Sequence, residues 1–158
     1  MEIRETIMDH LTKLFVDIEK IVNLFPDNLW QREGIDDMMM VPAFLAHHTI
    51  WCMCYEHLLN IPKEKIPNEP YIPRHEKWPW IPDYQRGYLP AKSQLLALLN
   101  DIREYADSIY GKMDDDAYLS GSKPILNMVV YAIAHTRHHL GQLTQILKEN
   151  GVMPTNMV

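Results

Sequence analysis

The chain of 158 residues contains little cysteine. Its two cysteines, Cys52 and Cys54, stand two positions apart. On a helix their side chains would point about 200° apart, so they cannot form a disulfide with each other. We therefore expect reduced thiols, as in a cytoplasmic protein.

Long apolar runs are absent as well. No stretch approaches the roughly 18 uninterrupted apolar residues of a membrane-spanning helix. The first ten residues, MEIRETIMDH, include acidic side chains, whereas a secretion signal has a basic stretch followed by an apolar one. The expected location is the cytoplasm, with no membrane partner.

Positive charge is also scarce. The sequence has 15 Lys and Arg residues against 21 Asp and Glu residues, which gives a formal net charge of −6. The basic residues do not gather into a cluster of the kind that binds phosphate backbones. A nucleic acid is therefore not expected as a partner.

Four segments do carry apolar residues at helical spacing. They predict helices over residues 3–24, 42–60, 91–110 and 122–150. Pro26 follows the first of them and would stop it.

Local signals predict where the last two helices end. Gly111 is the expected C-terminal cap of the third helix, and Ser122 the expected N-terminal cap of the fourth. The pair Asn150 and Gly151 would end the fourth helix. Between the two helices, the acidic run 114–116 is expected to be a solvated turn.

Residues 61–90 contain most of the chain's eleven prolines together with several Trp and Tyr residues, which favours a long ordered loop. Such a connection can cross the bundle, so that the second and third helices run parallel. The predicted fold is all-α, a four-helix bundle with a long crossover loop between its second and third helices, and residues 1–158 are expected to form one domain. Apolar residues beside the main stripes of the first and third helices are compatible with a homodimer.

The chain has eight histidines, and several of them cluster in two of the predicted helices. His135 and His139 are four residues apart. Both imidazoles therefore lie on one helix face, about 6 Å apart along the axis, where they can converge on one ion. This face continues through Met128, Ala132, Gln142 and Ile146. The pair is therefore predicted to point into the bundle.

A histidine of the second helix could complete a triad. His48 belongs to an apolar stripe, and His47 belongs to the neighbouring stripe, which is apolar too. Periodicity alone does not choose between them. Cys52 follows His48 by one turn and is either a soft ligand or a core thiol. Gln142 is a candidate to orient a substrate or a bound water.

Three neutral imidazoles suit an ion such as zinc or nickel and leave a coordination position open. An ion at such a site acts as a Lewis acid that lowers the pKa of water or of a thiol. The alternative is that each buried histidine simply bonds to a carbonyl or a carboxylate. Inward imidazoles without partners would each cost about 1 to 3 kcal/mol, which favours the metal.

Two segments, AFLAHH (43–48) and HTRHHLGQL (135–143), resemble the signature segments of the DinB-like superfamily of four-helix metalloproteins. In that family one histidine early in the second helix and an H-x3-H pair on the last long helix, followed by G-Q, bind one divalent ion. The resemblance assigns the pair to His135 and His139. Through Ala43 and Phe44 it also selects His48 over His47 as the third ligand.

The resemblance also implies a chemistry. Relatives include thiol-dependent transferases and an isomerase that use bacillithiol or mycothiol. We therefore expect a thiol-dependent transferase or hydrolase that acts on a small electrophilic substrate, with one divalent ion, zinc or nickel, and a low-molecular-weight thiol as cofactors. The alternative is a non-enzymatic stress-response protein that binds a structural ion. Aromatic residues of the second helix and the loop could line the substrate pocket or pin the loop down: Trp51, Tyr55, Trp78, Trp80, Tyr84 and Tyr88.

Overall fold

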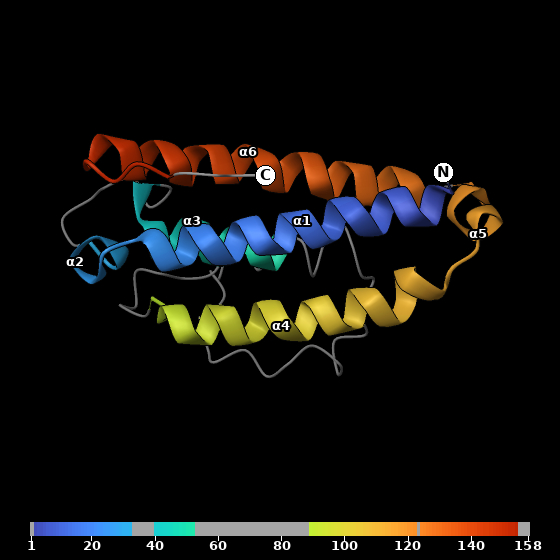
Figure 1. Cartoon of the computed structure of the whole chain (residues 1–158), viewed down its shortest axis with the longest axis horizontal. Coiled ribbons are helices and arrows are strands. Elements are labelled where there is room, and N and C mark those ends of the chain that lie inside the picture. Colours follow the sequence, from blue (N-terminus) through green and yellow to red (C-terminus); the bar gives the residue numbers. More distant parts are fainter. Residues whose placement is uncertain (1, 33–39, 53–88, 123, 155–158) are drawn as a thin grey trace, which may run out of the picture.

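A computed structural model of the chain describes residues 2–32, 40–52, 89–122 and 124–154 (Figure 1). All regular structure in these ranges is helical, which confirms the predicted all-α class. The elements are α1 (Ile3–Leu24), α2 (Asp27–Trp30), α3 (Pro42–Cys52), α4 (Lys92–Ile109), the 3₁₀ helix η5 (Tyr110–Lys112), α5 (Asp115–Leu119) and α6 (Ile125–Glu149).

The long helices α1, α3, α4 and α6 form a bundle in which α1 and α3 each pack against both α4 and α6. Figure 1 shows α1 and α6 running in one direction and α3 and α4 in the other. The consecutive long helices α3 and α4 are thus parallel, in agreement with the predicted crossover topology. The connection between them falls in residues 53–88, outside the described part, and the assignment of 1–158 to one domain stays a prediction.

Most of the predicted helix boundaries are confirmed within a residue or two. Helix α1 has the predicted bounds, because Phe25, the residue before Pro26, already adopts an extended conformation. Helix α3 begins at Pro42 as predicted, and the predicted continuation to residue 60 lies outside the described residues. Helix α6 ends as predicted: Gly151 has a φ of +78°, and its N–H and that of Val152 bond back to Lys148 and Leu147.

Two predicted caps are wrong. Gly111 does not end α4 in the left-handed conformation, because the chain tightens directly into η5 at Tyr110. Ser122 does not cap α6, since the helix begins three residues later with Pro124 at its N-cap. Proline there already holds φ at −54°, a backbone angle that suits the entry into a helix.

The core lies between the long helices and is apolar. The apolar residues of α1 that follow helical spacing are buried from Ile7 to Val22. Helices α4 and α6 each contribute buried apolar residues of their own. A fully buried side chain of this kind stabilises the fold by about 1.5 to 3 kcal/mol. The most buried large members are Leu11, Leu14, Phe15, Ile18, Ile21, Phe25, Leu45, Ile50, Leu95 and Tyr118.

The acidic run between α4 and α6 is not a free turn, as we had expected, but forms the short helix α5. Asp114 caps α5 by accepting the N–H of Ala117 at 2.8 Å. The Asp115 carboxylate accepts the N–H groups of Ile3 and Arg4, each at 3.0 Å. These bonds from Arg4 and Ile3 lower the pKa of Asp115. Asp115 therefore caps the first turn of α1 from a distant part of the sequence.

Helix α2 was also not anticipated, and tertiary contacts hold it against the start of α4. The Trp30 indole N–H donates to the carbonyl of Pro90 at 2.8 Å, and Lys92 forms an ion pair with Asp27 at 2.6 Å. The Trp30 ring also packs on Phe25, with 5.9 Å between ring centroids. Across the described helices, none is long and apolar enough to cross a membrane.

Candidate metal centre

Helix α3 supplies one histidine to the site. Nearly every described side chain of α3 is buried, as expected for a helix that is apolar on all sides and packs against α2, α4 and α6. His48 is half-buried on its α6 side, where its ring stacks on Phe44 with centroids 6.3 Å apart. His47 is buried as well, at 3% exposure, but it does not belong to the cluster that His48 joins.

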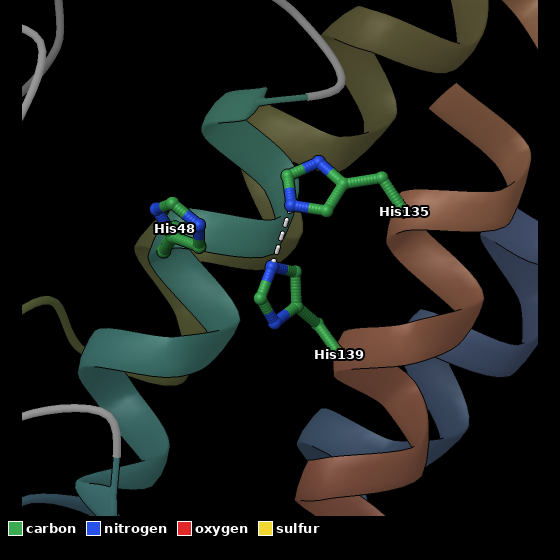
Figure 2. Close-up of side chains that lie close together, drawn as sticks. All are labelled: His48, His135 and His139. Carbon is green, nitrogen blue, oxygen red and sulfur yellow. Dashed lines mark hydrogen bonds between the residues drawn. The ribbon is translucent and has the colours of Figure 1, made fainter. Parts of the chain in front are cut away.

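Helix α6 supplies the other two histidines. His135 and His139 lie one turn apart on the face toward α3, and Figure 2 shows their rings beside that of His48. The Nε2 atoms of His135 and His139 are 2.8 Å apart. The centroid of the His48 ring lies 4.8 Å from that of His139 and 5.9 Å from that of His135. The structure thus brings together the three histidines that the sequence singled out.

The donor set fits a divalent ion. One nitrogen from each histidine can be chosen so that all three lie within 4.8 Å of one another. In a tetrahedral site, zinc–nitrogen bonds of about 2.0 to 2.1 Å keep two nitrogen ligands about 3.3 Å apart. The spacings in the triad, from 2.8 Å upward, bracket that value. Imidazole nitrogens are ligands that several divalent transition metals accept.

Two imidazoles of the triad, those of His48 and His139, resist protonation, which suits them to bind a cation. Burial, followed by the neighbouring His139, His135 and His47, lowers the pKa of His48 to about 4. Burial also lowers the pKa of His139, although the bond to Gln142 opposes this effect. At neutral pH both rings are therefore uncharged and carry a free lone pair, the form that binds metals.

A hydrogen bond sets the orientation of His139. Its Nδ1 lies 2.6 Å from the side-chain oxygen Oε1 of Gln142, the residue one turn further along α6. Gln142 was a sequence candidate for orienting a substrate or a water, and the structure instead places it against a histidine of the triad. His138 has an exposed side chain and is not part of the group.

Two contacts of the site were missed from the sequence. Phe44 stacks on His48, and Tyr131 lies against His135 with centroids 5.8 Å apart. Each aromatic residue precedes its histidine by four positions on the same helix. The four-residue spacing is therefore the signal that could have revealed them.

An ion pair on the opposite face fixes α6 against α1. Asp17 of α1 is completely buried, and Arg137 of α6 donates to its carboxylate. Arg137 stands midway between His135 and His139 in the sequence. The ion pair therefore fixes how α6 is rotated about its own axis in the turn that carries His135 and His139.

The remaining sequence candidates cannot be placed at the site. The side chains of Cys52 and Trp51 and the loop aromatics lie outside the described residues.

Comparison with known proteins identifies the family. The family model of the DinB superfamily matches residues 10–143, which include all three histidines of the triad. No curated protein and no solved structure matches the chain. Because the family match covers most of the sequence and agrees with the all-α bundle, the chain belongs to the DinB superfamily.

Proposed function

We propose that this protein is a divalent-metal-dependent enzyme whose ion is held by His48, His135 and His139. The convergence of three imidazoles from two helices, with donor atoms within 4.8 Å, carries this proposal. Zinc and nickel are the ions we propose, because both accept imidazole nitrogen ligands.

The three ligands leave room for chemistry. The three donors that the described residues supply do not complete a tetrahedral shell, and three protein ligands with an open position are the pattern of catalytic rather than structural sites. When bound, a divalent ion supplies Lewis acidity, which favours the anionic form of water or of a thiol near neutral pH. His139 is buried, whereas His48 and His135 are half-buried, so the site is closed on the His139 side and more accessible on the other.

We propose further that the reaction is the transfer of a thiol to a small electrophilic molecule, or the hydrolysis of one. Membership of the DinB superfamily supports this class, because the histidine motifs of this chain resemble a family whose relatives include thiol-dependent transferases, and the family match covers both motifs. A low-molecular-weight thiol would then be the second cofactor.

A purely structural ion is less well supported. Among the described residues every buried side-chain nitrogen or oxygen has a hydrogen-bond partner without any ion. The core is apolar and extends through all the long helices. The fold therefore does not need an ion to satisfy its buried polar groups.

Elemental analysis of protein purified without chelators tests the metal site. We expect about one zinc-like or nickel-like ion per chain in the wild type, and loss of most of it in His48→Ala and His139→Ala. His47→Ala and His138→Ala are matched controls, because each removes a neighbouring histidine outside the triad, and both should keep the ion. Unchanged metal content in His139→Ala would overturn the proposal.

The enzymatic part needs a separate assay. Metal-loaded wild type should consume an electrophilic substrate in the presence of a low-molecular-weight thiol, or of water alone for a hydrolase. The His48→Ala variant should not. A fully loaded protein that turns over none of a broad substrate panel would favour the non-enzymatic alternative.

A further inference from the structure

The side chain of Gln142 contacts a member of the triad directly. Its Oε1 lies 2.6 Å from Nδ1 of His139, and the two residues are three positions apart on one face of α6. A side-chain amide oxygen can only accept a hydrogen bond. With Oε1 of Gln142 in this position, the contact is a hydrogen bond when Nδ1 of His139 carries the proton.

The other ring nitrogen of His139, Nε2, points away from Gln142 and toward His135. Nε2 of His139 lies 2.8 Å from Nε2 of His135, on the side of the triad. With the proton on Nδ1, this Nε2 is a lone pair that accepts from His135. The two bonds therefore form one directed chain that runs from His135 through His139 to Gln142.

Burial makes this chain effective. His139 is 5% exposed and Gln142 is half-buried, so water does not freely compete for Nδ1. In such surroundings a hydrogen bond is stronger than in water, and neighbouring bonds polarise one another. The ring is thus held in one tautomer and one orientation.

We infer that Gln142 is a positioning residue that fixes His139 as the Nδ1–H tautomer and so presents Nε2 to a metal ion. The role of His139 as a metal ligand rests on the proposed function, whereas its tautomer is a property of the metal-free protein. Partners of this kind typically change metal affinity by about 10- to 100-fold when they are removed.

The first test uses metal-free protein. Long-range ¹H–¹⁵N NMR of the histidine rings should show His139 protonated at Nδ1 in the wild type and in Gln142→Glu, which keeps an acceptor. In Gln142→Leu, which removes the acceptor, the proton should move to Nε2. A wild-type His139 protonated at Nε2 would overturn the inference, whatever the protein does with metals.

The second test uses zinc. Competition with a chromophoric chelator should give a dissociation constant about 10- to 100-fold weaker for Gln142→Leu than for wild type, with recovery in Gln142→Glu. Gln145→Leu is the matched control, because Gln145 is an exposed glutamine of the same helix that bonds to Glu149. Equal affinity of wild type and Gln142→Leu would refute the positioning role. A wild type that binds no zinc at all would instead refute the proposed function.

Discussion

Protonation of His48 is unfavourable inside the bundle, because burial and the neighbouring imidazoles lower its pKa from 6.5 to about 4. Between these pH values the unfolded chain binds a proton at His48 and the folded chain does not. Linkage then requires the free energy of unfolding to fall as the pH falls through this window. The free energy of unfolding is therefore highest, as far as His48 is concerned, above pH 6.5, and this stability is lost as the pH falls toward 4.

We therefore expect metal-free protein to lose stability as the pH is lowered from about 6.5 to about 4, and His48→Gln to lose less over the same range. Urea denaturation in the presence of a chelator, repeated across this range, measures the effect. His10→Gln removes an exposed histidine and should keep the wild-type dependence. Identical pH profiles for wild type and His48→Gln would contradict this assignment.

At the scale of residues the sequence predicted the pair on α6 best, because a four-residue spacing puts two side chains on one helix face however the helix packs. The choice between His47 and His48 depends on the rotation of α3, and both neighbouring stripes are apolar. Only the resemblance to the superfamily favoured His48 in advance. The contact of Gln142 with His139 depends on side-chain torsions, which no periodic pattern contains.

Two polar contacts hold helix α1 against its neighbours, one at its first turn and one further along the helix. Asp115 caps its first turn, and Asp17 pairs with Arg137 of α6 deeper in the structure. In the first contact the Asp115 side chain accepts from the backbone of α1, and the second joins the side chains of two long helices. Each makes a separate prediction.

Replacing Asp115 by alanine should loosen the start of α1, because the N–H groups of Ile3 and Arg4 lose their acceptor. Hydrogen exchange at these amides should accelerate, and the melting temperature should fall modestly. Asp116→Ala is the control, since Asp116 is an exposed neighbour on the same short helix. Equal exchange in the two variants would show that the cap contributes nothing.

Removing Arg137 should lower the free energy of unfolding more than removing Asp115. Arg137→Met keeps the length of the side chain but leaves the Asp17 carboxylate buried without its guanidinium partner. We expect a loss of about 2 to 3 kcal/mol in the free energy of unfolding, below the range for fully buried pairs because Arg137 is partly exposed. The double variant Asp17→Leu and Arg137→Met should recover part of the loss. Chemical denaturation of the three proteins tests this, and additive losses would contradict a direct pair.

The sequence predicted the long helices better than the short ones. Helix α1 shows six turns of periodic apolar residues before a proline, so its bounds follow from local physics. Helices α2 and α5 have four and five residues, too few for a periodic signal, and contacts with distant segments hold them in place. The failed cap at Gly111 has a similar cause, since Tyr110 is buried against Tyr118 and draws the chain into η5.

The described helices are held together by a core of apolar side chains, which does not depend on the triad for its packing. Removing the ion with a chelator should therefore leave the helical circular dichroism spectrum intact. Adding zinc back should stabilise the fold by about 2.7 kcal/mol at a free concentration of 100 times the dissociation constant. Collapse of the helical signal on chelation would contradict this and identify the ion as structural.

The triad joins α3 to α6, two helices that lie far apart in the sequence and contact each other only in the assembled bundle. Contacts between distant segments form late during folding, because the chain must first lose the entropy of closing the intervening loop. An ion that needs all three histidines would therefore act mainly on the completed fold. It would slow the opening of the bundle more than it would speed its formation, so bound metal would lengthen the lifetime of a fold that already forms without it.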